Sequence, residues 1–254
     1  MKMAFRLGLV LIGLIFGSQA AFAEVSWTHY YWPNGVYVGA AGVFGYTFFR
    51  VNGALNSATT PVLYKSKNKS STAGFNVRVG FAPKQMPFHF DVFFNCLNRF
   101  HYNSTPVFTA PSITYNNLTS NLSSKAIFVN AYYDMPLYNK FWPYVGIGVG
   151  PAWNKTSLTA TGAPGSIKVN HTKKNIAMQG TIGFNVKVMK NVLLYGAYRF
   201  IDIGKVQWGP WDTTRATLTS ENIFVHQGEL GFKVFFGDQT PSQPPSLVND
   251  TVDR

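Results

Sequence analysis

The stretch NIFVHQGELGFKVFF, residues 222–236, decides the fold. Its even-numbered positions are mostly large and apolar, from Phe224 to Phe236, whereas its odd-numbered positions include Gln227, Glu229 and Lys233. Successive side chains of a strand point to opposite faces, so this period of two predicts a β-strand with one apolar and one polar face.

The same alternation recurs earlier in the chain and predicts eight strands in all. They are expected at about 35–51, 72–82, 88–103, 123–135, 142–159, 173–189, 192–208 and 222–236. Four long polar connections, at 52–71, 104–122, 160–172 and 209–221, alternate with three short turns. Outer-membrane barrels show this asymmetry, with short periplasmic turns and longer extracellular loops, and an even strand number permits antiparallel closure.

The apolar faces decide between a soluble and a membrane barrel. Strands two to eight each carry a face almost free of charge over about 9–11 residues, the length that a tilted strand needs to cross a bilayer. A soluble lipocalin-type barrel would place these faces inside, but an eight-stranded barrel has room only for packed side chains. We therefore predict an all-β, eight-stranded antiparallel transmembrane β-barrel over 35–237, with its apolar faces toward lipid. Aromatic residues are expected in two girdles, at the turn end Tyr138, Phe141 and Trp142, and at the loop end Phe100, Tyr102, Trp153 and Trp208.

The two ends of the chain are expected to lie outside the barrel. Lys2 and Arg6 precede an uncharged run, 7–17, and a small-residue cleavage site at 21–23, which predicts a signal peptide over 1–23. The run is too short for a transmembrane helix. Residues 24–34 are expected to form a periplasmic segment, and 238–254 a disordered tail.

Charge and cysteine content narrow the partners. The formal net charge is +12, a value that nucleic-acid-binding proteins also show. Export excludes nucleic acid as the natural partner, so outer-membrane lipid, lipopolysaccharide and anionic host or matrix polymers are the expected ones. Cys96 is the single cysteine and cannot form an internal disulfide.

Three short motifs carry a resemblance to a known family. They are the run PYVGIGVG at 143–150, the tripeptide YRF at 198–200, and Gly231-Phe232 leading to Phe235-Phe236. With them the chain resembles, over about 35–236, the small eight-stranded outer-membrane barrels, the family of the barrel domain of outer membrane protein A and its X-type relatives. The resemblance implies insertion by the barrel-assembly machinery, which reads a terminal strand that ends in an aromatic residue, and Phe236 matches that role. The residues after Phe236 are too few for a peptidoglycan-binding domain, so that activity is not carried over.

The polar faces are expected to meet inside the barrel as a charged network. Its members are Arg78, Asp91, Arg99, Asp134, Lys187, Arg199, Glu229 and Lys233. Buried charges must be paired and hydrogen-bonded, which favours a structural network over a proton path or a catalytic carboxylate. The hairpin register brings Arg199 near Glu229, so Glu229→Ala is expected to leave Arg199 or Lys233 unpaired. The glycines at 146, 148 and 150 are expected to make room for larger side chains opposite.

Motifs for catalysis are weak. The five histidines show no metal-ligand spacing, and neither a Gly-x-Ser-x-Gly elbow nor a nucleotide loop is present, so we expect no enzyme activity, no metal and no cofactor.

A basic patch is expected on the loops, formed by Lys65, Lys67, Lys69, Lys168, Lys173 and Lys174. It either neutralises lipopolysaccharide phosphates or binds anionic polymers as an adhesin does. The sequence thus predicts a non-enzymatic outer-membrane protein with a structural or surface-interaction role. A lipid-modifying enzyme using His101, Ser104 and Asp212, or a very narrow pore, stays open as an alternative.

Overall fold

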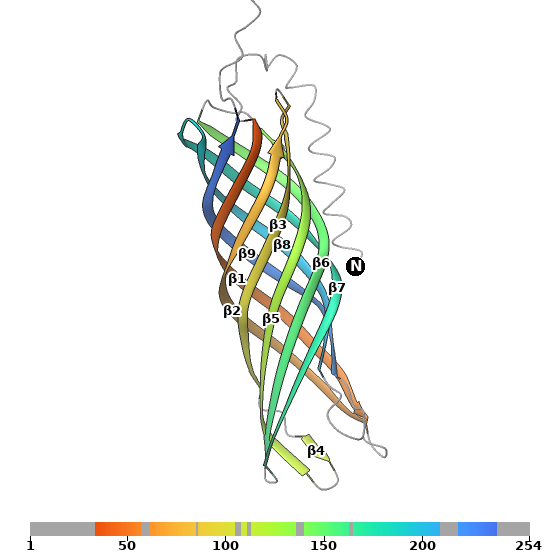
Figure 1. Cartoon of the computed structure of the whole chain (residues 1–254). Helices are drawn as coiled ribbons and strands as arrows, with labels where there is room; N and C mark the ends of the chain where they lie inside the picture. Colours follow the sequence, from red (N-terminus) through yellow and green to blue (C-terminus); the bar gives the residue numbers. More distant parts are fainter. Residues whose placement is uncertain are drawn as a thin grey trace, which may run out of the picture. The chain divides into compact units, whose positions relative to one another are not determined.

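The strands of the chain form one sheet that closes on itself (Figure 1). The computed structural model describes residues 34–237 apart from 57–60, 85, 105–107, 111–112, 136–139, 163–164 and 209–217. They lie within one compact unit, Trp32–Thr240. The expected signal peptide, the expected tail and nearly all of the expected periplasmic segment lie outside the described residues. No helix in the described part of the chain is long and apolar enough to cross a membrane.

Eight long strands and one short strand make up the described fold. They are β1 Gly35–Asn56, β2 Pro61–Ala82, β3 Phe88–Ser104, β4 Phe108–Ala110, β5 Ile113–Asp134, β6 Phe141–Gly162, β7 Gly165–Met189, β8 Val192–Trp208 and β9 Leu218–Phe236. Neighbouring strands are antiparallel, and the pairings of β1 with β9 and of β3 with β5 complete the circle, while β4 pairs with β5. The predicted eight-stranded antiparallel barrel is confirmed.

Several strands are longer than predicted. β6 and β7 pair without interruption from Phe141 opposite Val186 to Gly162 opposite Gly165. Much of the segments 52–71, 104–122 and 160–172 is therefore strand, and the expectation of long loops there is wrong. These segments are rich in Ser, Thr and Asn, so they lack the apolar alternation from which a strand is recognised, although backbone pairing holds them as strands.

The barrel divides into two sheets toward the end that carries the long hairpins. The pairing of β2 with β3 ends at Gly74 opposite Leu97, and that of β7 with β8 ends at Met178 opposite Asp202. The remaining pairings continue, so β3, β5, β6 and β7 form one extended sheet and β2, β1, β9 and β8 form the other (Figure 1). Beyond the two gaps the fold is a pair of facing sheets.

A register shift accompanies each gap. In β3 it lies between Leu97 and Phe100, immediately after the last pair with β2. In β8 it lies after Asp202, where Gly204 has a φ of 76°, in the left-handed region that favours glycine. An extra residue in a strand moves the following side chains to the opposite face. The alternation is therefore reversed in the outer parts of β3 and β8.

This reversal adds Phe100, Tyr102, Val206 and Trp208 to an apolar core between the two sheets. Its large members include Leu97, Phe100, Tyr102, Leu122, Phe128, Leu158, Ile201, Ile203, Val206, Trp208, Ile223 and Val225, all buried. The expected outer girdle is thus wrong for Phe100, Tyr102 and Trp208, whereas Trp153 faces outward and is half-buried. At the turn end Trp142 is buried inside and Phe141 faces outward.

The outer wall of the closed part is a continuous apolar belt. Its most exposed side chains are each more than half exposed and include Val79, Val92, Val129, Ile147, Ile176, Met178, Ile182, Leu230 and Phe232. Lysines close the belt at the turn end, one in each short connection, namely Lys84, Lys140 and Lys190. A water-soluble surface would not expose such a belt, so it faces the hydrocarbon of the bilayer.

Candidate functional site

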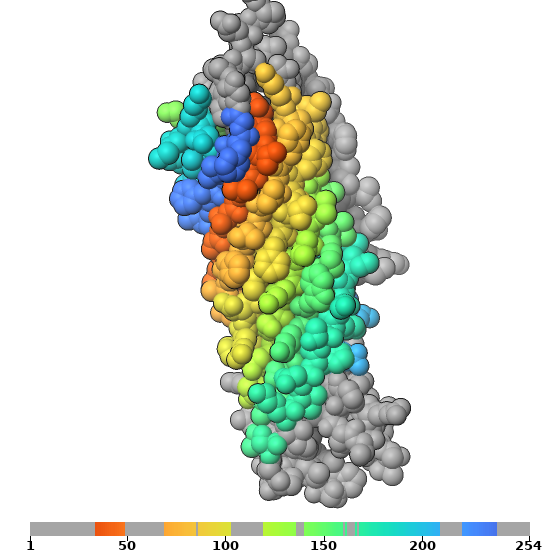
Figure 2. Space-filling model, viewed as in Figure 1, coloured from red at the N-terminus to blue at the C-terminus, as the bar shows by residue number. Residues whose placement is uncertain are grey.

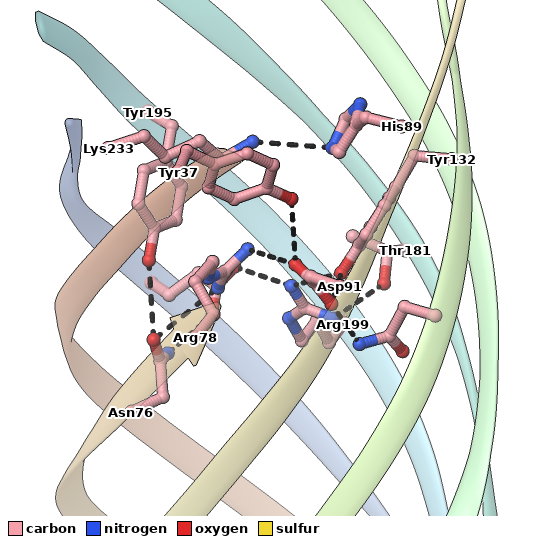
Figure 3. A network of polar contacts seen from close by, with 12 residues as sticks. Tyr37, Asn76, Arg78, His89, Asp91, Tyr132, Thr181, Tyr195, Arg199 and Lys233 are labelled. Atoms are coloured by element: carbon pink, nitrogen blue, oxygen red, sulfur yellow. Dashed lines mark hydrogen bonds and ion pairs between the residues drawn. The ribbon is translucent and has the colours of Figure 1, made fainter. Parts of the chain in front are cut away.

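A fully buried charged cluster occupies the middle of the barrel (Figure 3). Glu229 of β9 accepts hydrogen bonds at Oε1 from Arg78 Nη2 at 3.0 Å and from Arg199 Nη2 at 2.9 Å. Its Oε2 accepts a third from Asn76 Nδ2 at 2.7 Å. All three charged side chains have no exposed surface. One carboxylate therefore bridges two guanidinium groups that come from β2 and β8, the strands on either side of the β1–β9 pair.

Asp91 of β3 supplies the second buried carboxylate of this cluster. Its oxygens accept hydrogen bonds from Tyr37 Oη at 3.2 Å and from Asn130 Nδ2 at 2.6 Å. Arg78 Nη1 lies 3.6 Å from Asp91 Oδ2. The central cluster thus contains two positive and two negative groups, so its charges balance without solvent.

Aromatic rings fill the space around the guanidinium groups. The Phe93 ring centroid lies 5.0 Å from Arg78 Cζ and 4.4 Å from Arg199 Cζ, and the Tyr195 ring lies 4.4 Å from Arg78 Cζ. Both rings stack on delocalised cations, an arrangement that favours the charged state in a dry interior. Phe93 and Tyr195 are not among the residues predicted for the network from the sequence.

Glycines on β6 leave space for large inward side chains of the neighbouring strand β5. A Cβ on Gly146 would lie 2.2 Å from the Tyr132 ring, and one on Gly148 would lie 1.8 Å from Asn130 Oδ1. The expectation that these glycines make room for larger side chains opposite is confirmed for Gly146 and Gly148, whereas a Cβ on Gly150 would meet the backbone of Ile127. Such inward glycines are a sequence signal from which the aromatic lining of the interior could have been found.

A second cluster lies nearer the turn end. Lys233 Nζ donates to Asn185 Oδ1 at 3.0 Å and lies 3.4 Å from His89 Nε2. His89 Nδ1 pairs with the Asp134 carboxylate, which also accepts a hydrogen bond from Asn185 Nδ2 at 3.2 Å. Lys233 therefore belongs to this cluster, and within the described residues its hydrogen-bond partners are Asn185 and His89, not Glu229. The substitution Glu229→Ala would accordingly leave Arg199, and not Lys233, without its carboxylate partner.

Beside this second cluster lies a cavity of about 20 Å³, room for roughly one water molecule. Trp142, Leu193 and Phe235 line it and belong to a buried apolar cluster at the turn end. On the other side of the charged clusters lies the apolar core between the two sheets. Within the described residues, the charged groups therefore lie between two apolar clusters.

Two members of the expected network lie elsewhere. Arg99 is exposed on the outside of the barrel, because the register shift after Leu97 turns it away from the interior. Its place in the lumen network is therefore wrong. Lys187 lies near the short turn and is half exposed. The other six residues are all buried inside the barrel.

Four lysines of the expected basic patch and the expected insertion signal are at least partly exposed. Lys69, Lys168 and Lys174 are exposed and Lys173 is half exposed; Lys65 and Lys67 belong to β2, but their side chains lie outside the described part. Phe236 is the last residue of β9, pairs with Val36 and is 56% exposed toward lipid. Its role in insertion stays a prediction.

The chemistry open to the buried clusters is limited by access. Catalysis needs a substrate within hydrogen-bond reach of the reacting group, and the central carboxylate and guanidinium groups have no exposed surface. No group of three or more His, Cys, Asp or Glu side chains in the described residues is arranged to hold a metal ion. The arrangement is suited to holding the barrel wall together.

Comparisons with known proteins agree with this geometry. The outer membrane protein beta-barrel domain family matches residues 9–239. A Rickettsia canadensis protein named as a candidate adhesin is 28% identical over 103 residues, which cover 39% of this chain and 46% of that protein. The outer membrane protein PagN of Salmonella typhimurium is 32% identical over 94 residues, covering 35% and 38%. The matched region therefore spans less than half of each of these curated relatives.

A solved structure shows the same fold. Outer membrane protein AlkL, determined in lipid bilayers, aligns with 84% of this chain and 95% of its own length, with a TM-score of 0.51 and 17% identity. At that identity the likeness concerns the fold alone. The family match extends over nearly the whole described barrel, and the apolar belt places this barrel in a bilayer. The chain belongs to the outer membrane protein β-barrel domain family and is a protein of the bacterial outer membrane.

Proposed function

We propose that this chain is a non-enzymatic surface-interaction protein whose extended hairpins bind anionic polymers outside the cell. The observation that carries the proposal is the basic β6–β7 hairpin, which continues as paired strand beyond the apolar belt up to Gly162 and Gly165. It bears Lys168, Lys173 and Lys174, and the chain has no acidic residue between Asp134 and Asp202. A rigid, cationic projection suits multivalent contact with a polyanion.

The enclosed interior supports a scaffold role. A pore would need a continuous polar path, but the charged clusters lie between the Trp142 and Phe235 side chains on one side and the apolar core on the other. An enzyme would need accessible reacting groups. The remaining way to act on another molecule is through the outer surface, above all the part that extends beyond the membrane.

The comparisons lend the proposal indirect support. One matching relative is named as a candidate adhesin, and the similarity covers under half of its length. The part of the chain that would contact a ligand is polar and strand-forming. The proposed adhesive role of this chain therefore rests mainly on the charge and the length of its hairpins.

The test compares lysines at the two ends of the barrel. Fluorescent heparin, a sulfated polysaccharide, is titrated into the purified full chain in detergent, and binding is followed by anisotropy. The variant K65Q/K67Q/K168Q removes three charges near the hairpin tips, and K84Q/K140Q/K190Q removes three from the short turns. An exposed ion pair contributes about 0.2–1 kcal/mol, so we expect about tenfold weaker binding for the first variant alone.

Two outcomes would count against the proposal. One is unchanged heparin binding by the tip variant, and the other is an equal loss in the turn variant, which would indicate a nonspecific charge effect. Binding should also weaken steeply with added salt. In a separate measurement, planar bilayers containing the protein should show no stable unitary currents; regular current steps would favour the narrow pore.

A further inference from the structure

The outward face of each membrane strand ends at a characteristic residue. Following the exposed positions from the turn end, the first charged side chain is Arg99 on β3, Lys125 on β5, Lys155 on β6 and Lys174 on β7, all exposed. On β2 the first charged outward residue is Lys69, on β8 it is Asp202, and on β9 it is Glu221. The outer border of the apolar belt is therefore cationic on β2, β3, β5, β6 and β7, whereas its first charges on β8 and β9 are acidic.

Four of these cations form a compact group, here called the cationic arc: Arg99, Lys125, Lys155 and Lys174. Lys125 pairs with Trp153, and Trp153 pairs with Lys174, so the three form one row across β5, β6 and β7. Neighbouring strands are about 4.8 Å apart, which places the two lysine backbones about 10 Å from each other. The indole between them faces outward and is half-buried.

A second row lies one step further from the belt. Lys155 pairs with Ser123 on one side and with Thr172 on the other. Arg99 lies between Leu97, opposite Ser124, and Phe100, opposite Leu122, so the register places it beside Ser123. The arc thus combines four cations with hydroxyl groups on four adjacent strands, which lie side by side on the face seen in Figure 2.

An apolar strip begins directly below the arc. Ile127 is 38% exposed, Val149 48% and Ile176 74%, and they occupy the same strands as the two rows. Cations above an apolar wall, with a tryptophan at the boundary, match an amphiphile that has phosphate groups on its head and acyl chains below. The acidic border at Asp202 and Glu221 would repel the same head group.

We propose that the cationic arc is a binding site for the phosphorylated head group of an outer-leaflet glycolipid, whose acyl chains lie on the strip below. Lysine ammonium and arginine guanidinium groups donate to phosphate oxygens, and the outward Trp153 side chain lies at the boundary between the cations and the apolar strip. The site fixes which side of the barrel the glycolipid occupies. It shares Lys174 with the basic β6–β7 hairpin but includes none of the lysines near the hairpin tips, Lys65, Lys67 and Lys168.

The experiment titrates bisphosphorylated lipid A into the full chain in detergent and counts bound lipid by native mass spectrometry. The variant K125Q/K155Q removes two charges from the arc, and K84Q/K190Q removes two from the turns. A cation near an anionic lipid surface contributes about 1 kcal/mol, or about fivefold, so we expect about 25-fold weaker binding for the arc variant only. Dephosphorylated lipid A should bind the unmodified protein as weakly as bisphosphorylated lipid A binds the arc variant.

Three results would overturn the site. They are unchanged binding in K125Q/K155Q, equal weakening in K84Q/K190Q, or equal binding of the dephosphorylated lipid. Displacement of lipid A by inorganic phosphate would likewise show a site for the free anion instead. Folding of the arc variant is checked by heat-dependent gel mobility. If this variant does not fold, the measurements with dephosphorylated lipid A and with inorganic phosphate on the unmodified protein test the site. Heparin binding by K125Q/K155Q should stay near normal, which separates this site from the hairpin tips.

Discussion

Replacing Glu229 by glutamine should strongly destabilise the barrel. The substitution keeps the shape of the side chain and removes its charge. In the native protein Arg78 and Arg199 are balanced by Glu229 and Asp91, and none of these side chains has exposed surface. In E229Q the same dry interior holds two guanidinium groups and one carboxylate, so one positive charge is left without compensation.

The magnitude follows from the remaining contacts. Arg78 retains Asp91 at 3.6 Å, whereas Arg199 keeps only neutral partners among its hydrogen bonds, Thr181 Oγ1 at 3.0 Å and Tyr132 Oη at 3.2 Å. Removing one partner of a buried ion pair costs about 3–5 kcal/mol, because the other charge stays buried. We expect a loss in this range. The double variant E229Q/R199Q restores charge balance and should recover at least about 2 kcal/mol, a coupling within the range for contacting residues.

The assay is equilibrium unfolding by urea in lipid vesicles, followed by tryptophan fluorescence. Glu221 lies on the same strand and is exposed, so E221Q serves as the matched control and should change stability by less than about 0.5 kcal/mol. A loss below about 1 kcal/mol in E229Q would refute the reasoning. So would additive effects of E229Q and R199Q, since these would show that the two groups do not share one charge balance.

Three further substitutions test other parts of the fold. Ile147 is 73% exposed on the apolar belt, so I147R should cost about 2–4 kcal/mol in the same urea assay, whereas T159R, farther out on β6, should cost little. Trp208 is buried between the two sheets, so W208A should cost about 3–5 kcal/mol and speed amide exchange in the outer ends of β8 and β9 more than near the turns. Gly148 abuts Asn130, so G148V should prevent the barrel from folding in detergent, as judged by gel mobility, while substitution of the open Gly180 by valine should be tolerated.

Period-two alternation was enough to predict the barrel, because lipid imposes a strict apolar face on each membrane strand. The prediction of interior residues succeeded where the alternation runs without interruption, as from Gln227 to Lys233 in β9. It failed at Arg99 because an inserted residue shifts the phase of β3, and single-sequence alternation does not mark where such a shift occurs. Trp208 was misplaced for the same reason in β8.

The outer strand extensions were missed for a different reason. A strand in water needs no apolar outer face, so segments such as 160–172 carry polar residues on both sides and look like loops. Their strand character comes from pairing with a neighbour, as in the continuous β6–β7 register. The partners of the buried charges come from strands that are far apart in the sequence, for example Arg78 of β2 and Glu229 of β9. A local sequence pattern carries no information about such contacts.

The two halves of the molecule are stabilised by opposite arrangements of the same strands. Within the belt, apolar side chains face outward and charges are paired inside, because lipid cannot solvate them. Beyond the belt, water surrounds the strands, so burial of apolar side chains between two sheets becomes the main driving force. In β5 the inward face changes from polar, at Asn130 and Asp134, to apolar, at Leu122, without a change of phase. In β3 and β8 a register shift changes which residues face inward. The shift after Leu97 turns Arg99 outward at the border, so one inserted residue both directs Phe100 and Tyr102 into the apolar core and contributes a cation to the proposed glycolipid site.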